Sequence, residues 1–190
     1  MDIAEKKVAI LVDDYFEESE FAEPLKALKN AAVTVTVVGT ERKDLHALQH
    51  VKPGGAYQAD VLLGDVDFED FDALVLPGGV VNADKLRMNE LARDWVRHCV
   101  ETNKPLAAIC HAPWVLVSAG VIDGLRLTSY YTLQDDIRNA GGEWEDSQVV
   151  IDDRVITSRK PDDLPAFTTA LLQMLQADHD KQLNEEAYSA

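Results

Sequence analysis

The sequence contains little cysteine and no long hydrophobic run. Only Cys99 and Cys110 are cysteines, and they lack the CxxC spacing of zinc sites, so we expect neither a structural zinc site nor a disulfide framework. The longest apolar stretches, such as 8–12 and 73–76, fall far below the roughly 20 residues of a transmembrane helix. Acids and lysines occupy the N-terminus, where a signal peptide has its basic end and apolar core. We therefore expect a cytoplasmic protein.

Basic side chains are also scarce. Eighteen lysines and arginines stand against 34 acidic residues, which gives a formal charge of −16 with no basic run. This charge disfavours nucleic-acid and anionic-membrane partners. With 190 residues, 46% of them hydrophobic, the chain suits one α/β domain and is too short for two ordinary ones. We predict a single domain over 1–190, with its core at about 7–176 and a polar, frayed C-terminal tail at 177–190.

Short β-branched runs alternate with helical patterns along the chain. Strands are predicted at 7–14, 33–40, 72–79, 105–110 and 124–130, helices at 17–31, 89–103, 112–120, 133–142 and 163–177, and a hairpin at 148–159. Segment 41–70, rich in Gly and Asp, predicts a short hairpin or an inserted loop. The alternation predicts an α/β fold whose central sheet is mostly parallel, with helices on both faces.

Chemically active residues follow three of the predicted strands. Asp13, Asp14 and Glu17 follow the first, the Gly78–Gly79 pair follows the third, and Cys110–His111 follows the fourth. Ligands bind open parallel sheets beyond the carboxyl ends of the strands, so these residues are expected to converge. A cysteine at such a strand-to-helix turn is expected to have a lowered pKa.

Each of these residues also has a plainer interpretation. Unpaired cysteines are often simply buried, which is our interpretation of Cys99 and the alternative for Cys110. Glu18 and Glu20 are interpreted as a solvated helix face or as N-terminal charges. Asp13 and Asp14 lack a second acid or histidine cluster, so we expect no metal site, and we expect no cofactor.

The motifs together resemble a known family. The segments "FEESEF", "DALVLPGG", "AICHAPWVLVSAGVIDG", "LTSY...DDIRNAG" and "VITSRKPDDLPAF" occur in the order typical of the ThiJ/PfpI superfamily, within its intracellular protease I-like branch of small stress proteins. The resemblance runs from about residue 7 to residue 176. It implies a flavodoxin-like three-layer sandwich of the class I glutamine amidotransferase-like type, a reactive cysteine on a nucleophile elbow, and a homodimer or higher homo-oligomer.

The resemblance also implies roles for individual residues. Cys110 corresponds to the elbow cysteine, His111 to its neighbouring histidine, and Glu17 to the glutamate that hydrogen-bonds the sulfur. Asp84 corresponds to a glutamate that a neighbouring subunit contributes to orient the histidine. The aspartate side chain is one methylene shorter than glutamate, and the segment around Asp84 is one residue longer than in protease-like members of the family.

Three further positions correspond to the family's pocket. Gly78 and Gly79 match a loop whose backbone amides line the pocket as an oxyanion site, and Tyr130 matches a pocket tyrosine. We expect the amides around Gly79 and Ala112 to hold an oxyanion. Many members have glycine where this chain has Ala112, which is expected to narrow the elbow slightly. A glutamine amidotransferase would need a downstream histidine partner, and only His179 in the tail lies there.

Three classes of function fit these residues. The first is a cysteine-dependent hydrolase or lyase that acts on small electrophilic carbonyls, glycated adducts or peptides, with His111 as acid and base. The second is a redox-sensing stress protein in which Cys110 is oxidised without turnover. The third is a holding chaperone. The enzyme ranks first, with a small carbonyl compound or a peptide as its partner.

Overall fold

A seven-stranded sheet forms the centre of the protein. The computed structural model describes the backbone of residues 3–189 and side chains up to residue 178. The strands follow the order β11 (Val149–Asp152), β12 (Val155–Ser158), β8 (Leu106–Ile109), β7 (Ala73–Leu76), β1 (Lys7–Val12), β3 (Thr34–Gly39) and β6 (Val61–Leu62). All neighbouring pairs are parallel except β11 with β12. The predicted parallel sheet and the C-terminal hairpin are confirmed.

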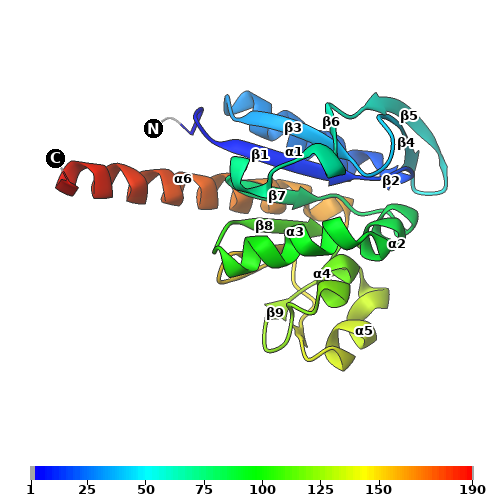
Figure 1. Cartoon of the computed structure of the whole chain (residues 1–190). Coiled ribbons are helices and arrows are strands. Elements are labelled where there is room, and N and C mark those ends of the chain that lie inside the picture. The colour runs from blue at the N-terminus through cyan, green and yellow to red at the C-terminus, as the bar shows by residue number, and fades with distance from the viewer. Residues whose placement is uncertain (1–2, 190) are drawn as a thin grey trace.

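Helices cover both faces of this sheet (Figure 1). One face carries α1 (Glu18–Asn30) and α6 (Leu164–Ser189), whose Phe21 and Phe167 are packed in one core with Ile10 of β1. The other face carries α2 (Val80–Met88), α3 (Glu90–Glu101) and α4 (Pro113–Ala119). Alternate side chains of β1 thus enter two separate cores, because successive residues of a strand point to opposite faces. The flavodoxin-like three-layer sandwich is confirmed.

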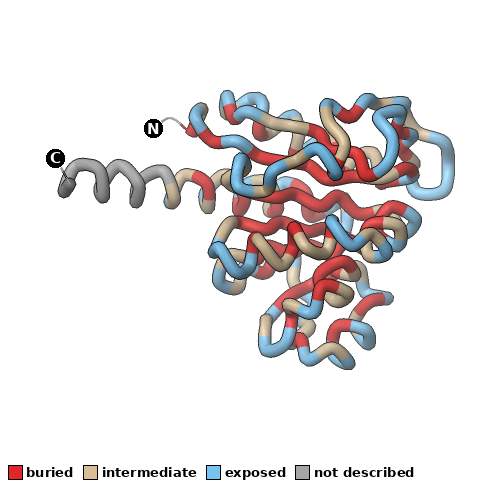
Figure 2. Tube along the Cα trace, in the orientation of Figure 1, coloured by how far each residue is buried: buried red, intermediate tan, exposed pale blue. Residues whose placement is uncertain are grey.

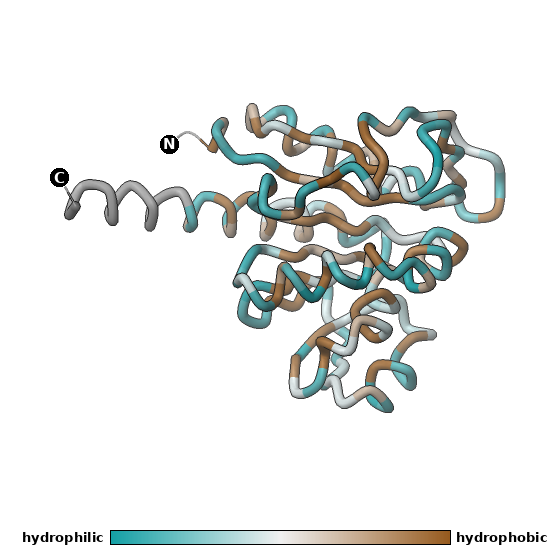
Figure 3. The backbone as a smooth tube through the Cα atoms, in the orientation of Figure 1, coloured by the Kyte–Doolittle hydropathy of each residue, from teal (hydrophilic) through white to brown (hydrophobic). Residues whose placement is uncertain are grey.

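Burial follows the hydropathy of the sequence. The central strands are buried along nearly their whole length (Figure 2), and the same strands are the most hydrophobic parts of the chain (Figure 3). Strands buried on both faces read as continuous apolar runs, as β7 and β8 do. No helix among residues 3–189 is long and apolar enough to cross a membrane.

The remaining elements flank the sandwich. The short strand β2 (Phe16–Glu17) pairs with β4 (Asp44–Gln49), which forms an antiparallel hairpin with β5 (Lys52–Gln58). Segment 41–70, predicted as a short hairpin or an inserted loop, contains this hairpin together with β6 and two short 3-10 helices. A second small sheet joins β9 (Arg126–Leu127) to β10 (Glu143–Trp144), and α5 (Gln134–Asn139) lies between them in the chain. Within the described residues, short 3-10 helices lie at 63–65, 68–70, 131–133 and 161–163.

Some predicted elements differ from the structure. The strand predicted at 124–130 is only two residues long, because it pairs with a two-residue partner outside the main sheet. Helix α2 was not predicted, since its apolar residues do not follow a helical period. The tail predicted to be frayed continues α6 as helix to Ser189; side chains from residue 179 lie outside the described residues. Gly120 ends α4 at φ 75°, as predicted.

The topology brings several strand ends to one place. Chain direction across the sheet reverses at β1, whose neighbours β3 and β7 follow it on opposite sides. Doubly wound sheets bind ligands in the crevice beyond the carboxyl ends of the strands at this reversal. The segments that leave β1, β7, β8 and β12 therefore meet at one edge of the sheet.

Candidate active site

Cys110 occupies a strained turn between β8 and α4. Its φ of +63° lies in the left-handed region that non-glycine residues rarely adopt. The Cys110 N–H donates to the Ser158 carbonyl at 3.0 Å, and the Cys110 carbonyl accepts from the Tyr130 N–H at 2.8 Å. These two bonds hold the backbone in its strained conformation. Backbone strain of this kind costs about 1–3 kcal/mol and typically persists at functional sites. The strained strand-to-helix turn at Cys110 has the form of a nucleophile elbow.

His111 contacts the sulfur directly. Its Nδ1 lies 3.2 Å from the Cys110 Sγ, and both residues are buried. The Tyr130 ring stacks on the imidazole with the ring centroids 4.8 Å apart. Imidazole and thiol are therefore within proton-transfer distance, and the tyrosine fixes the plane of the imidazole.

The carboxyl group beside the thiol belongs to Glu20, and the expectation for Glu17 is wrong. Glu20 is completely buried on α1, and its carboxyl faces the Cys110 thiol and the Gly78 amide. Neither carboxyl oxygen has a hydrogen bond of standard geometry within the described part of the chain. A buried polar group without standard partners calls for a functional explanation. The interpretation of Glu20 as a solvated side chain is wrong as well.

Glu17 lies in the same cavity but faces the β4–β5 hairpin. Its carboxylate accepts a hydrogen bond from the His50 backbone N–H at 2.8 Å, and the His50 Nδ1 lies 3.6 Å from it. Glu17 belongs to β2, which pairs with β4, so its side chain is directed to the hairpin tip rather than to the sulfur. Its negative charge helps to raise the pKa of Glu20.

Burial sets the protonation of all three central groups. Desolvation raises the pKa of Glu20 to about 8 and lowers that of His111 to about 4. Burial and the nearby Glu20 charge raise the pKa of Cys110 above its ordinary value. The backbone amides of Gly79 and His111 lower this pKa, but their effect is smaller than the combined rise. The expected low thiol pKa is wrong for this environment. At neutral pH thiol, imidazole and carboxyl are all uncharged.

Backbone amides from two loops converge on the sulfur. The N–H groups of Gly79 and His111 both donate to Cys110. Gly79, at φ +90°, forms part of the cavity lining, as the sequence predicted. The role expected for Ala112 is wrong, because its N–H donates to the Ile109 carbonyl at 3.0 Å within the turn. The amides available for an oxyanion are those of Gly79 and His111.

Gly78 provides room behind the site. A Cβ at this position would lie 2.3 Å from a Glu20 carboxyl oxygen and 2.6 Å from the Cys110 Cβ. We expect Gly78→Ala to lower the free energy of unfolding by about 1–3 kcal/mol and to displace the carboxyl. Gly64→Ala is the matched control, because nothing lies within 4 Å of its Cβ position. Urea denaturation measures both, and equal stabilities for the two variants would contradict this packing.

Asp84 does not belong to this cavity within one chain. It is exposed on α2 and lines a separate cavity of about 310 Å³ with Asp13, Arg42 and Lys85. Asp13 there contacts Lys85, and Asp14 contacts Arg42. The role implied for Asp84 involves a second subunit, so it stays a prediction.

The cavity above Cys110 has a volume of about 540 Å³. Its inner part is formed by Glu20, Gly79, Cys110 and His111, and its walls include Tyr130 as predicted. Sequence analysis missed several of its residues, which come from separate segments of the chain: His50, Val51, Val80, Thr132, Lys160, Pro161 and Asp162.

One signal in the sequence identifies Glu20. Residues 20, 24 and 28 recur at helical spacing and are all buried on α1, whereas Leu25 of the predicted stripe is only partly buried. Glu20 therefore lies on the inward face of the helix. The loop residues Lys160 and Asp162 carry no comparable signal, because only the sheet topology brings them to the cavity.

The fold and this site define a class of protein. It is a flavodoxin-like α/β protein in which a cysteine on a nucleophile elbow, a histidine and a buried carboxyl meet at the carboxyl edge of a parallel sheet. The family model for the DJ-1/PfpI family matches residues 6–174. The chain belongs to the DJ-1/PfpI family.

Individual relatives agree with this assignment. Protein/nucleic acid deglycase 2 of Escherichia coli (strain K12) is 39% identical over 90% of this chain and 99% of its own length. General stress protein 18 of Bacillus subtilis (strain 168) is 37% identical over 90% of this chain and 98% of its own. A solved two-domain protein from Anabaena variabilis, with DJ-1/ThiJ/PfpI-like and ferritin-like domains, is 36% identical. Its TM-score is 0.84, and the match covers 90% of this chain and 48% of that protein.

Proposed function

We propose that this protein is a cysteine-dependent hydrolase or lyase that acts on small electrophilic carbonyls or on their adducts with amines and thiols. The contact of His111 Nδ1 with the Cys110 sulfur, inside a cavity of substrate size, carries the proposal. The name of the Escherichia coli relative, a deglycase, supports this substrate class. A role in the stress response is supported by the name of the Bacillus subtilis relative.

The uncharged resting state determines the first chemical step. The buried histidine has a pKa of about 4 and the thiol pKa is raised, so a resting thiolate–imidazolium pair is disfavoured at neutral pH. His111 instead accepts the thiol proton as the sulfur donates its electron pair to the carbonyl carbon. The carbon–oxygen π pair moves to oxygen, which takes the proton back from His111. The product of this step is a hemithioacetal, and no external acid is consumed.

Developing charge is stabilised by groups already in place. The amides of Gly79 and His111 lie at the sulfur and are available to a neighbouring oxyanion. Glu20 keeps its proton at neutral pH because its pKa is raised to about 8, so its O–H group faces the sulfur and is available as a donor. Its neutral form avoids repulsion with the negative charge that develops on sulfur as the thiol proton moves to His111.

The volume of the cavity favours small substrates. About 540 Å³ accommodates a compact adduct, whereas peptide hydrolysis needs an extended cleft. Peptide hydrolysis by the same nucleophile is the other reaction in this class. Steady-state turnover of methylglyoxal, of its hemithioacetal with N-acetylcysteine and of a peptide, each compared with Cys110→Ala, tests the proposal and separates the two reactions.

Loss of the imidazole is expected to slow turnover strongly. We expect His111→Ala to reduce kcat by roughly 10²- to 10⁴-fold, since general acid–base catalysis contributes factors of this size. Alkylation of Cys110 by iodoacetamide is expected to persist, because the sulfur stays in the cavity. The wild-type pH profile should rise through about pH 4 as His111 loses its proton, and this limb should be absent in the variant. An unchanged kcat would assign the proton transfer to another group.

Redox sensing is the second candidate function, and the environment of Glu20 favours it. The protonated Glu20 carboxyl is buried and faces the sulfur, and it has no hydrogen-bond partner of standard geometry among the described residues. A sulfinate formed by two equivalents of peroxide would present an oxygen to this donor. Turnover independent of added oxidant supports the enzyme, whereas oxidation without turnover supports the sensor.

Asp84 is proposed to act only in an oligomer. It is exposed on α2, beside the exposed apolar residues Val80, Val81 and Met88, which are suited to a contact between subunits. In a homodimer or larger assembly, the partner's Asp84 would orient the imidazole of His111. Analytical ultracentrifugation decides this role, because a stable monomer cannot bring the two residues together.

A further inference from the structure

One ion pair lies at the rim of the cavity above Cys110. The Lys160 Nζ is 2.9 Å from an Asp162 carboxylate oxygen, and both residues line the cavity. Lys160 is the only lysine or arginine among the lining residues that the structure describes. The two side chains differ in exposure, at 46% for Lys160 and 78% for Asp162. Asp162 thus lies on the solvent side of the pair.

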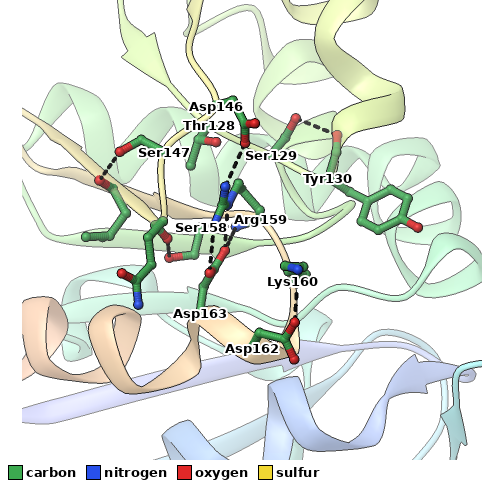
Figure 4. Close-up of polar contacts among 12 residues, drawn as sticks. Thr128, Ser129, Tyr130, Asp146, Ser147, Ser158, Arg159, Lys160, Asp162 and Asp163 are labelled. Atoms are coloured by element: carbon green, nitrogen blue, oxygen red, sulfur yellow. Dashed lines mark hydrogen bonds and ion pairs between the residues drawn. The ribbon is translucent and has the colours of Figure 1, made fainter.

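The backbone that carries Lys160 is fixed by its neighbour Arg159. The guanidinium donates to both carboxylate oxygens of Asp163, at 2.9 and 3.0 Å, and to Asp146 at 2.7 Å (Figure 4). Asp163 is buried. Paired charge-assisted bonds of this kind impose a defined geometry. Lys160 therefore extends from a rigid segment rather than from a mobile surface loop.

The ammonium group lies near the reacting residues. Burial raises the pKa of Tyr130, and the positive charge of Lys160 opposes that rise. Tyr130 in turn stacks on His111, whose Nδ1 contacts the Cys110 sulfur. Lys160, Tyr130, His111 and Cys110 thus line the same cavity, and the charge of Lys160 acts on the tyrosine that stacks on the catalytic imidazole.

The charges around the cavity make this cation unusual. The chain has a net charge of −16, and Glu17, Glu20 and Asp162 are the acidic residues that line the cavity. An anionic substrate is repelled by the protein as a whole and needs a local cation. Lys160 provides one, and an incoming carboxylate would replace Asp162, which then returns to water.

We propose that Lys160 is a specificity-determining residue that binds the carboxylate of a substrate whose electrophilic carbon is attacked by Cys110. The inference deepens the proposed function and rests on it for the role of Cys110. The substrate class is a carbonyl compound or adduct that carries a carboxylate, such as an adduct of a free amino acid or of a peptide C-terminus. Asp162 competes with this carboxylate for Lys160 and thereby lowers its affinity.

Two alkylating reagents test the inference without turnover. Iodoacetate and iodoacetamide react with the same sulfur and differ by one carboxylate. The measured quantity is the ratio of their alkylation rates at Cys110, followed by mass spectrometry at neutral pH and low salt. We expect Lys160→Met to lower the iodoacetate to iodoacetamide ratio about three- to tenfold. Asp162→Asn is expected to raise the ratio, because it frees the ammonium.

Lys7→Met serves as the matched control. Lys7 is exposed at the N-terminal end of β1, on the edge of the sheet opposite the cavity, and its loss changes the net charge equally. The control is expected to keep the wild-type ratio. A ratio unchanged by Lys160→Met, or lowered equally by Lys7→Met, would overturn the inference. A fall of the ratio in Asp162→Asn would overturn it too.

Turnover extends the same comparison to substrates. Hemithioacetals of methylglyoxal with N-acetylcysteine and with its carboxamide differ only in the carboxylate. We expect Lys160→Met to lower kcat/KM for the acid about tenfold and to leave the amide nearly unchanged. If neither adduct is turned over by the wild type while the alkylation ratios behave as expected, the proposed function fails and the carboxylate site stands.

Discussion

Replacement of Cys110 by alanine is expected to abolish turnover. The rate should fall by roughly 10⁴-fold or more, because removing a catalytic nucleophile leaves only the residual effects of binding and oxyanion stabilisation. Alanine has the same backbone restrictions as cysteine at φ +63°, so the strain of the elbow is unchanged. The variant is therefore expected to fold, and any lost activity reports on the sulfur.

Cys99→Ala is the matched control for this experiment. Cys99 is buried on α3 in the core on the opposite face from α1, and it does not line the cavity of Cys110. Its replacement is expected to cost about 1 kcal/mol of stability and to leave kcat/KM unchanged. Circular dichroism verifies folding of both variants, and steady-state assays with methylglyoxal measure turnover. Full turnover in Cys110→Ala would refute the proposed mechanism.

Removing the acid at Glu20 is expected to change the pH dependence of stability. The pKa of this carboxyl rises from an ordinary value of 4.5 to about 8 in the folded protein. Between these values the folded state holds a proton on Glu20 that the unfolded state has released, so the contribution of Glu20 to stability falls as pH rises from about 4.5 to 8. The rise in pH between these values therefore lowers the contribution of Glu20 to the free energy of unfolding by roughly 4–5 kcal/mol. Glu20→Gln lacks the titrating group and should lose that part of the dependence.

Chemical denaturation at pH 5 and at pH 8.5 measures this effect. Compared with Glu20→Gln, the wild type should lose several kcal/mol of stability between the two pH values. The buried His111, whose pKa is lowered to about 4, gains stability over this range in both proteins, so its contribution cancels in the comparison. Glu23→Gln, on the exposed side of the same helix, is the control and should behave as the wild type. Equal pH dependence in wild type and Glu20→Gln would show that the carboxyl is not buried in its acid form.

The same carboxyl is expected to influence oxidation. A protonated Glu20 donates to a sulfinate oxygen, and glutamine retains a donor of similar shape, whereas leucine offers none. We expect graded peroxide to give sulfinate in the wild type and in Glu20→Gln, and less of it in Glu20→Leu. Intact-protein mass spectra distinguish these products. The identical product in all three proteins would remove the support for redox sensing.

Glu17 and Glu20 show where sequence reasoning succeeded and where it failed. A carboxyl near the sulfur was predicted in the correct segment, but at the wrong position. The residues that face the core from α1 depend on where the helix starts. Glu17 lies just before the helix, in β2, and β2 pairs with β4, which is distant in the sequence. Local periodicity cannot reveal such a contact.

The thiol illustrates a second limit. Its place after β8 and next to His111 follows from the strand pattern, but its acidity depends on burial and on Glu20, which no local motif encodes. Ala112 is similar, because only the closed turn shows that its amide already donates to Ile109. Helix α2 was missed because it lacks an apolar period, and its place is determined by packing against α3 and α4.

Apolar periodicity and the residues at strand ends are local properties of the chain, so they were enough to predict the parallel sheet, the elbow with Cys110 and His111, and the glycine loop. Three features became visible in the folded chain alone: which carboxyl meets the sulfur, how burial shifts the pKa values, and the place of the Lys160–Asp162 pair at the rim of the cavity. These features arise from segments that are distant in sequence and become neighbours when β1, β7, β8 and β12 align. Their electrostatics depend on the exclusion of water from that junction.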